Sequence, residues 1–359
     1  MRVKNLKLRN FRNYTDVNLE FEKGVNYIQG DNGSGKTSLV EAIGLLSMCK
    51  SIRTSDEKEV IKCDEESASV NAEVENQINN QIKIVISQNG KYIELDGNDV
   101  KKVSNIAGIV KIVSFLPKDV ELFKQSPSKR RKFIDANLSM VNSKYLRVLS
   151  EYNHFLGEIR ELVKEDSFDE IALDVLIKEI SKRGYSILEY RKQFISWLNE
   201  KLKVIGKYLQ GDENAFVLKY QENLKSINSE KDYCASLSQQ IKKDLLKDKY
   251  RIIISGIHLD DLSCEYNGLD LSIYGSQGQN RISVIALKLS LYELIKEKFE
   301  TQSIVILDDV LSELDYDNQT KLIKYLTQVE QVFITGTKFD LEIPVSLFTV
   351  KNNNVWRNN

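Results

Sequence analysis

The chain has 359 residues, and its 51 Lys and Arg against 52 Asp and Glu give a formal net charge of −1 at pH 7. Its length leaves room for about two domains, and a content of 42% hydrophobic and 29% charged residues excludes a disordered or fibrous chain. No apolar run approaches the ~18–20 residues that span a bilayer, and the first residues do not form the apolar core of a signal peptide. The four cysteines form no CxxC pair, which argues against a zinc ribbon. We therefore expect a cytoplasmic protein with no membrane partner.

Charge is distributed unevenly along the chain. Residues 1–118 carry 17 basic and 16 acidic side chains, residues 119–250 carry 24 and 21, and residues 251–359 carry 10 and 15. The middle segment is therefore the only one with a clear positive excess. With a net charge near zero, any binding of nucleic acid must come from a local patch rather than from the field of the whole molecule.

The hydrophobic pattern also changes along the chain. Apolar and polar residues alternate over 17–21 and 70–74, as expected of half-buried strands. Residues 25–28 form a short apolar run that leads into glycines, and residues 109–115 form another. These four segments predict strands.

After Pro117 the pattern is helical up to about Tyr250. Ser128 is expected to cap a helix that starts in 129–132, and residues 171–202 contain no proline and one glycine, which favours a long helix. Strands are expected again at 252–254 and 304–307. The predicted fold class is α/β: a domain built from residues 1–118 and 251–359, interrupted by a helical insertion over 119–250.

Residues 30–37 match the phosphate-loop pattern G-x-x-x-x-G-K-[ST], between a predicted strand and an apolar helical run. Glycines let backbone N–H groups wrap around a phosphate chain, and the helix N-terminus adds partial positive charge. The lysine would reach the β- and γ-phosphates of ATP, and the threonine would place a hydroxyl on Mg²⁺. The candidate ligands are Gly30, Asp31, Asn32, Gly33, Ser34, Gly35, Lys36, Thr37 and Ser38.

The predicted strand at 304–307 ends in two carboxylates, Asp308 and Asp309. Asp308 is expected to hold Mg²⁺, and Asp309 to orient or deprotonate an attacking water. Lys36 and Asp309 are thus the candidate catalytic residues of an ATPase. An apolar strand that ends in Asp-Asp is by itself weak evidence for an ATPase site. It becomes strong evidence when the same chain also contains a phosphate loop.

Two further segments resemble motifs of the ATP-binding-cassette superfamily. Residues 275–281 stand before an apolar helix, where Ser276, Gly278 and Gln279 resemble the signature sequence, and residues 312–315 resemble the D-loop that ends in Asp315. A Ser-x-Gly sequence also makes an ordinary helix cap. In that superfamily the signature of one subunit touches the γ-phosphate held by the other.

Within the superfamily, the chain resembles the RecF family of bacterial recombination-repair ATPases, which are related to chromosome-maintenance proteins. The resemblance runs over nearly the whole length and is carried by the blocks at 10–14, 50–54, 116–119, 127–135, 256–261, 276–281 and 331–335. Asn280, Ile257 and Leu259 depart from the family pattern, and no glutamine is identified for the Q-loop near 114–118.

The resemblance implies several further roles. Arg12, Asn13 and Arg53 would contact the nucleotide or a partner subunit, although an N-terminal arginine is also commonly solvated. Independently of the resemblance, the cluster of Lys129, Arg130, Arg131 and Lys132 opposes a helix dipole, which makes binding to DNA phosphates more plausible. The alternatives are the solvated start of a helix and a bracing role for the two arginines.

The leading functional hypothesis is a DNA-binding ATPase switch, in which ATP drives a homodimer onto double-stranded or gapped DNA and slow hydrolysis releases it. Family resemblance implies a role in DNA replication, repair and the SOS response, helping a RecA recombinase to load with a RecR-type mediator. The alternatives are the nucleotide-binding subunit of a transporter and a small-molecule kinase. The long helical insertion argues against a transporter subunit, and the signature helix argues against a small-molecule kinase.

Overall fold

The computed structural model describes residues 1–54, 56–164, 168–225, 227–247, 255–340 and 342–358. The chain forms two compact units: Met1–Val120 together with Val284–Asn359, and Glu121–Ser283. Both ends of the chain thus contribute to the first unit. The predicted assignment of residues 119–250 to an inserted arm domain stays a prediction.

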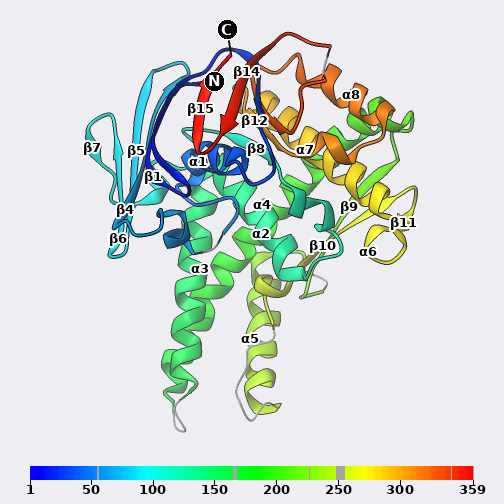
Figure 1. The fold of residues 1–359 in the computed structure, drawn as a ribbon. Coiled ribbons are helices and arrows are strands. Elements are labelled where there is room, and N and C mark those ends of the chain that lie inside the picture. Colours follow the sequence, from blue (N-terminus) through cyan, green and yellow to red (C-terminus); the bar gives the residue numbers. More distant parts are fainter. Residues whose placement is uncertain (55, 165–167, 226, 248–254, 341, 359) are drawn as a thin grey trace. The chain divides into compact units, whose positions relative to one another are not determined.

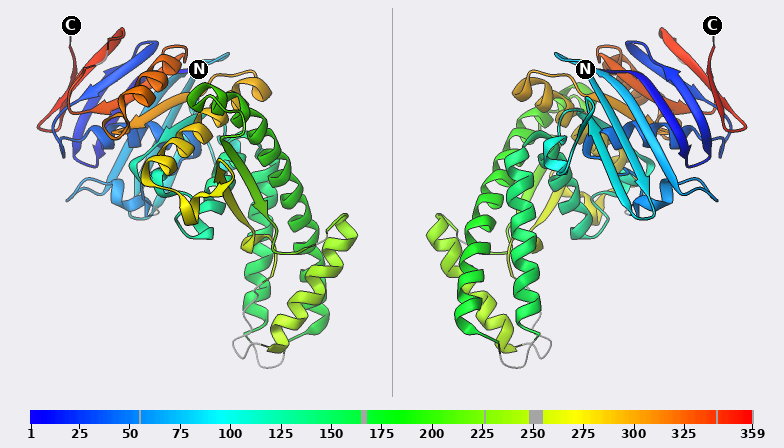
Figure 2. Two further views of the ribbon diagram at one scale, coloured as in Figure 1. Left: turned by 90° about the vertical axis from the view of Figure 1, so that its right-hand side faces the viewer. Right: turned by 90° about the vertical axis from the view of Figure 1, so that its left-hand side faces the viewer.

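The first unit contains an antiparallel sheet in the order β2-β1-β4-β5-β6-β7. Its strands are β1 (Arg2–Phe11), β2 (Tyr14–Glu20), β4 (Ser67–Glu75), β5 (Asn80–Ser87), β6 (Gly90–Leu95) and β7 (Asn98–Asp99). Alternate residues of β2 and β4 are buried, so the strands predicted from alternation are confirmed. The right-hand view of Figure 2 shows these strands, coloured blue to cyan, side by side.

The second sheet of this unit is mostly parallel, in the order β15-β14-β3-β13-β12-β8. Its strands are β3 (Gly24–Gln29), β8 (Ile112–Phe115), β12 (Ile304–Asp308), β13 (Gln331–Gly336), β14 (Val345–Lys351) and β15 (Asn354–Arg357). The N-terminal strand β3 lies between the C-terminal strands β13 and β14. The carboxyl ends of β3, β12 and β13 therefore meet at one edge of the sheet, where ligands of parallel sheets usually bind.

Helix α1 (Lys36–Met48) is buried on nearly every side, because the hydrophobic core joins it to side chains of both sheets. Figure 1 shows α1 among these strands. The unit also holds α8 (Tyr316–Leu326) and the short helices η1 (Glu57–Val60), η2 (Val103–Asn105) and η5 (Leu311–Glu313). Helix α7 (Gln277–Phe299) and η3 (Pro117–Glu121) run across the limits of the unit.

The second unit is mainly helical and contains α2 (Pro127–Val141), α3 (Ser143–Leu162), α4 (Glu170–Gln210), α5 (Glu230–Lys247) and α6 (Leu271–Tyr274). A small antiparallel sheet, β11-β10-β9, consists of β9 (Phe216–Gln221), β10 (Asp261–Tyr266) and β11 (Leu269–Asp270), and η4 is Ile257–Leu259. Helix α4 packs against α3 and α5, and Figures 1 and 2 show these helices side by side. The long helix predicted over 171–202 is confirmed and extends further at its C-terminal end. In the part of the chain described here, no helix has the length and apolar character needed to cross a membrane.

A buried arginine ties the second unit together. The Arg191 side chain is 1% exposed, and its guanidinium donates to the Asp135 carboxylate at 2.8 Å, the Tyr145 hydroxyl at 3.1 Å and the Ile257 carbonyl at 2.8 Å. These partners come from α2, α3 and η4, so one charged group on α4 joins three other elements. A buried charge persists only when it is paired in this way.

Some predicted elements differ from the structure. The helix expected to be capped by Ser128 begins at Pro127 after Ser126, because proline suits the first helical position. The strand expected from Ile109 begins at Ile112, after a turn at Gly108, whose φ is +82°. Strand β9 interrupts the segment that was expected to be entirely helical. The strand predicted at 252–254 lies outside the described residues.

Candidate nucleotide site

The phosphate loop lies between β3 and α1, the strand and helix that the sequence predicted on either side of it. Gly33 and Gly35 have φ values of +81° and +113°, which residues with a side chain rarely adopt. A Cβ atom on Gly35 would come within 2.8 Å of the Tyr14 hydroxyl, which donates to the Gly35 carbonyl at 2.9 Å. The loop therefore needs glycine here, both for its backbone conformation and for the close approach of β2.

Lys36 folds back over the loop. Its Nζ donates to the carbonyl oxygens of Gly30 at 2.7 Å and Asp31 at 2.9 Å. Burial lowers the pKa of Lys36, and the negative charges of Asp309, Asp308 and Asp31 oppose that shift. The ammonium group is thus held over the same loop whose backbone would surround a phosphate chain.

Thr37 and Asp308, the two predicted magnesium ligands, are in contact with each other. The Thr37 hydroxyl donates to Asp308 Oδ1 at 3.0 Å, and the Thr335 hydroxyl donates to the same oxygen at 2.8 Å. Burial raises the pKa of Asp308, although both hydroxyl groups and the charge of Arg53 act in the opposite direction.

A hydroxyl and a carboxylate at this separation fit Mg²⁺, which prefers oxygen ligands and commonly takes only one or two of them from the protein. Among the described residues, no three His, Cys, Asp or Glu side chains are grouped as a metal site.

Asp309 follows β12 in a left-handed backbone conformation, with φ of +54°. Its N–H donates to the Thr335 hydroxyl at 2.9 Å, and its Oδ1 accepts from the Ser312 hydroxyl at 3.2 Å. Aspartate tolerates this conformation better than most residues. The turn directs the two consecutive carboxylates to different partners.

Both arginines expected near the nucleotide contact one glutamate that the sequence analysis missed. Arg12 donates to Glu41 through Nε at 2.9 Å and Nη2 at 2.8 Å, and Arg53 donates to it through Nη1 at 3.2 Å. Burial by itself would raise the pKa of Glu41, but hydrogen bonds from Arg12 and Ser51 and the two positive charges hold it below its ordinary value. The available signal was a glutamate inside the apolar run of α1, since a buried carboxylate requires partners.

Asn13 lies beside the phosphate loop. Its Nδ2 donates to Asn353 Oδ1 at 2.6 Å and, more weakly, to the Ser34 carbonyl at 3.4 Å. In this structure Asn13 therefore links the loop to the turn between β14 and β15.

The signature residues form a reciprocal helix cap at the start of α7. Ser276 Oγ accepts from the Gln279 N–H at 3.2 Å, and Gln279 Oε1 accepts from the Ser276 N–H at 2.9 Å. Ser276 and Gly278 are exposed. Asn280, which departs from the family pattern, is buried and donates through Nδ2 to the carbonyls of Gly275 at 3.1 Å and Ser276 at 2.9 Å. Asn280 therefore stabilises the turn before α7 through these two hydrogen bonds.

Asp315 caps α8 in the predicted D-loop. Its Oδ1 accepts from the Asn318 N–H at 2.9 Å and its Oδ2 from Asn318 Nδ2 at 2.7 Å. The backbone hydrogen bond from Asn318 is the main reason that the pKa of Asp315 is lowered.

The basic cluster on α2 divides into two pairs. Lys129 and Lys132 are exposed. Arg130 forms two hydrogen bonds with the Asp261 carboxylate, at 2.8 and 2.6 Å, and Arg131 donates to the Asp260 carbonyl at 2.8 Å. These contacts favour a bracing role for the two arginines within the second unit.

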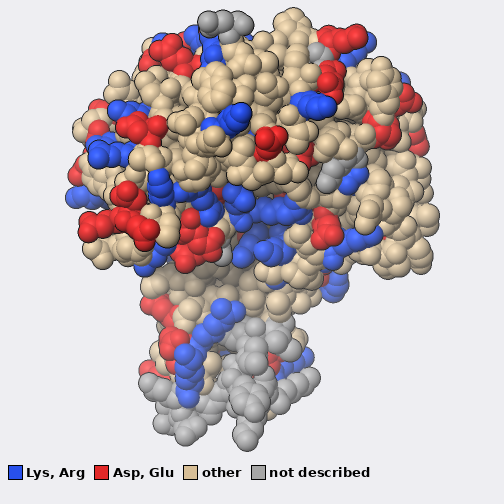
Figure 3. All heavy atoms as spheres, in the orientation of Figure 1, with Lys and Arg blue, Asp and Glu red and all other residues tan. Residues whose placement is uncertain are grey.

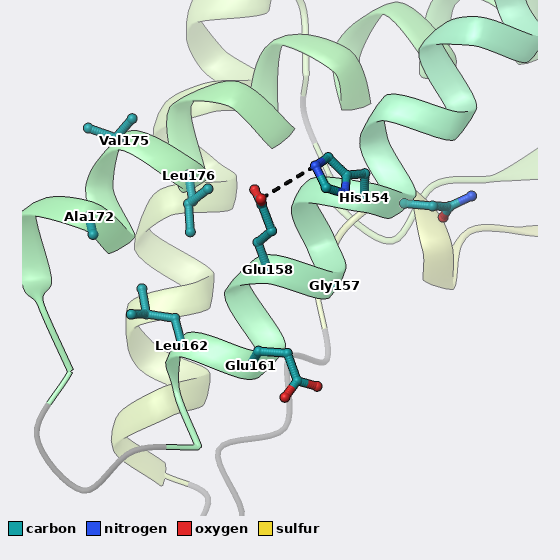
Figure 4. A pocket seen from close by; sticks show the side chains of 9 residues that line it. His154, Gly157, Glu158, Glu161, Leu162, Ala172, Val175 and Leu176 are labelled. Carbon is teal, nitrogen blue, oxygen red and sulfur yellow. Dashed lines mark ion pairs between the residues drawn. The ribbon is translucent and has the colours of Figure 1, made fainter.

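A hollow between α3 and α4, drawn in Figure 4, contains none of the predicted site residues. It is lined by Asn153, His154, Gly157, Glu158, Glu161, Leu162, Ala172, Val175 and Leu176. His154 and Glu158 approach each other there at 3.3 Å.

Comparison with known proteins agrees with this geometry. Residues 2–343 match the model of the RecF/RecN/SMC N terminal domain. The chain is 34% identical to the DNA replication and repair protein RecF of Clostridium novyi (strain NT), covering 99% of both chains. It is 36% identical to the protein of the same name in Acholeplasma laidlawii (strain PG-8A), covering 93% of both.

Solved structures give the same result. A structure described as the recombination mediator protein RecF-ATP in the RecFOR pathway has a TM-score of 0.92 and 32% identity, with coverage of 99% of this chain and 97% of that one. An SMC head bound to a winged-helix domain of ScpA, at 15% identity and a TM-score of 0.55, shares the fold alone. The predicted fold class, an ATP-binding-cassette type head with a helical insertion, is thereby confirmed, and the chain belongs to the RecF family of DNA replication and repair proteins.

Proposed function

We propose that this protein binds ATP with Mg²⁺ at the phosphate loop and uses the nucleotide to control its binding to DNA. The observation that carries the proposal is the 3.0 Å contact between Thr37 and Asp308, which joins the phosphate-loop helix to the carboxylate strand. Backbone N–H groups of residues 30–38 would surround the phosphates, and Lys36 would exchange its carbonyl partners for phosphate oxygens. The ATP-bound structure of a relative supports this assignment.

Thr37 and Asp308 would hold the magnesium ion, which neutralises phosphate charge when bound. Asp308 would then replace its bond from the Thr37 hydroxyl with a direct or water-mediated contact. Asp309 follows it directly and is the candidate for orienting and deprotonating a water. We propose a slow ATPase that acts as a switch.

A second copy of the chain would complete the site. Ser276, Gly278 and Gln279 stand exposed or half-buried at the N-terminus of α7, where backbone N–H groups and the helix dipole attract a phosphate. Asp315 would cross the same interface, and Asn13 and Arg12 would lie at its edge. ATP favours the dimer because it contacts both copies, so its binding energy is added only to the closed state.

DNA binding would use basic side chains on the dimer. Lys129 and Lys132 are exposed and are the candidates for this role, whereas Arg130 and Arg131 of the same cluster are engaged by Asp261 and the Asp260 carbonyl. The face drawn in Figure 3 carries Lys and Arg side chains, in blue, as well as Asp and Glu side chains, in red. Phosphate contacts of this kind supply sequence-independent affinity. The proposed substrate is double-stranded or gapped DNA in recombinational repair, and the proposed partner is a RecR-type mediator; relatives named DNA replication and repair protein RecF support this proposal.

Light scattering on the full chain tests the proposal. Samples with no addition, with ATP and Mg²⁺, with duplex DNA, and with both are compared. The expected result is a doubling of mass with ATP and Mg²⁺ and a DNA complex that needs the nucleotide. A mass unaffected by ATP would contradict the switch, and a transporter subunit would dimerise without retaining DNA.

A further inference from the structure

Glu41 lies on α1 one turn after the phosphate-loop residues Lys36 and Thr37. Its side chain is 0% exposed, so its charge is removed from water entirely. Burial of a carboxylate is costly unless hydrogen bonds and positive charges compensate for it. Two guanidinium groups and one hydroxyl do so here.

The two arginines contribute unequally. Arg12 makes two short bonds to Glu41, at 2.9 and 2.8 Å, and a third to the Glu59 carbonyl at 2.7 Å, and its side chain is 20% exposed. Arg53 makes one longer bond, at 3.2 Å, and its side chain is 42% exposed. Bidentate arginine pairs are the stronger and more specific ones. Arg12 is therefore the stronger partner of Glu41, and Arg53 is the weaker and more exposed one.

The backbone around Arg53 is held in place at its N-terminal side. The Ser51 hydroxyl donates to Glu41 Oε1 at 2.5 Å and accepts from the N–H groups of Arg53 at 3.0 Å and Thr54 at 3.1 Å. Glu41 thus fixes the turn from which the Arg53 side chain projects.

The same segment is also fixed by packing and by a lysine. A Cβ atom on Gly44 would come within 2.7 Å of Ile52, so Ile52 packs closely on α1. Lys118 Nζ donates to the carbonyls of Ile52 at 2.5 Å and Arg53 at 3.2 Å. A fixed backbone with a partly exposed side chain lets the guanidinium change partners without loss of fold.

Arg53 is also electrostatically coupled to the carboxylate strand. Burial raises the pKa of Asp308, and the positive charge of Arg53 is among the influences that oppose this shift. Glu41 lies four residues after Thr37 on α1, about 6 Å along the helix axis, so the Arg53 guanidinium that it holds lies within about one helical turn of the phosphate loop.

We propose that Glu41 is a positioning residue that holds Arg53 in a resting ion pair, and that the polyphosphate of a nucleoside triphosphate competes with Glu41 for this arginine. The inference rests on the proposed ATP site and adds a regulatory contact to it. Since the resting pair must break for Arg53 to reach phosphate, Glu41 lowers ATP affinity by the strength of that pair.

The test is a double-mutant cycle on the full chain, with ATP and Mg²⁺ as the titrant in calorimetry. Glu41→Gln should tighten ATP binding about two- to fivefold, the scale of a partly exposed ion pair. Arg53→Ala should weaken binding about tenfold, the scale of a lost charge-assisted hydrogen bond. In the double variant, the gain from Glu41→Gln should vanish. Glu59→Gln is the matched control, because Glu59 approaches Arg12 at 4.0 Å and is 57% exposed, so the change removes a nearby carboxylate while Glu41 stays in place.

The inference would be overturned if Glu41→Gln tightened ATP binding equally in the presence and absence of the Arg53 side chain. It would also be overturned if Glu41→Gln left ATP binding unchanged or weakened it while the Glu59→Gln control bound ATP normally. Should Glu41→Gln fail to fold, Glu41→Asp keeps the charge beside Arg12 but withdraws the carboxylate from Arg53, and it should change affinity in the same direction. Failure of the proposed function is recognised separately: the parent protein itself would then not bind ATP.

Discussion

The hydroxyl of Thr37 lies 3.0 Å from Oδ1 of Asp308, although 271 positions separate the two residues in the chain. The same oxygen accepts from Thr335, so α1, β12 and β13 converge on one buried carboxylate. The convergence arises because β12 and β13 are adjacent parallel strands that end at one edge of their sheet. We therefore expect different substitutions around this oxygen to affect nucleotide binding, ATP hydrolysis and the stability of the fold to different extents.

Lys36→Arg should weaken ATP binding about tenfold or more. The compact ammonium bonds two loop carbonyls, at 2.7 and 2.9 Å, and a planar guanidinium does not fit the same position. Calorimetry with ATP and Mg²⁺ measures the change, with Lys58→Arg at an exposed position as the control. Parent-like affinity in Lys36→Arg would mean that the phosphate loop is wrongly assigned.

Asp309→Asn should reduce steady-state ATP turnover by ~10²-fold or more, since it removes a general base. ATP binding should persist because Asp308 and Thr37 are untouched. Asparagine also accepts the left-handed backbone at this position, where φ is +54°, so the fold should be preserved. Phosphate release and a thermal melt measured together check both points, and unchanged turnover would exclude Asp309 from the chemistry.

Ser276→Arg should leave ATP binding by the single chain intact while preventing ATP-driven dimerisation. Ser276 is exposed at the start of α7, so an arginine there places bulk and charge on the proposed interface without filling the core. Loss of the cap should itself lower stability by about 1 kcal/mol. Ser276→Ala isolates that contribution, because it removes the cap bond without adding bulk. Calorimetry measures ATP binding and light scattering measures dimerisation. Loss of both in Ser276→Arg would contradict the interface role.

Asp308→Asn should stabilise the nucleotide-free protein at pH 7 by about 1 kcal/mol while abolishing tight binding of ATP with Mg²⁺. Because burial raises the pKa of Asp308, the folded protein binds this proton more tightly than the unfolded chain does. Stability of the parent therefore declines as the pH rises from the ordinary aspartate pKa through the raised value. Asp308→Asn has no carboxyl group here and lacks this decline. The difference in free energy of unfolding between the variant and the parent should therefore become smaller as the pH falls toward 4.

Urea unfolding of the parent and variant at pH 7 and pH 4 measures this difference. Asp16→Asn, at an exposed position of β2, is the control. A parent more stable than Asp308→Asn at both pH values would show that its two hydroxyl donors outweigh the cost of burial.

The two halves of the basic cluster on α2 should respond differently to alanine. Lys129→Ala with Lys132→Ala should weaken duplex binding similarly across sequences and flatten its salt dependence by up to about one unit per lost phosphate contact. Arg130→Ala with Arg131→Ala should mainly lower the melting temperature, because it leaves Asp261 without its bidentate partner. Binding isotherms at several salt concentrations, with melts alongside, distinguish the pairs. A flattened salt slope in the arginine variant with an unchanged melt would favour direct DNA contact by those residues.

Local patterns predicted much of the fold, and tertiary pairing explains what they missed. The long helix α4 and the apolar strands β3 and β12 were predicted because their signals lie within one continuous segment. Strand β9 was missed because it pairs with β10, whose paired residues lie 40 to 50 positions further along, so nothing local opposed the helical pattern.

The same distinction applies to the site. The phosphate loop and the Asp308–Asp309 pair could be predicted, since their chemistry depends on spacing alone. Glu41 could not, because its partners Arg12 and Arg53 reach it from separate loops. Arg130 and Arg131 were expected to face DNA because sequence does not indicate that Asp260 and Asp261 lie against them.

The position of β3 between β13 and β14 has a consequence for synthesis of the protein. All strands of the antiparallel sheet come from residues 2–99, so that sheet can assemble early on the ribosome. Strand β3 emerges just as early but receives its neighbours only when residues 331–351 have been made. Strand β3, which leads into the phosphate loop, therefore has neither of its neighbouring strands until residues 331–351 have been made. A chain released before residue 331 would carry the phosphate loop after a strand with no partner on either side, so the loop would lack the support of the parallel sheet.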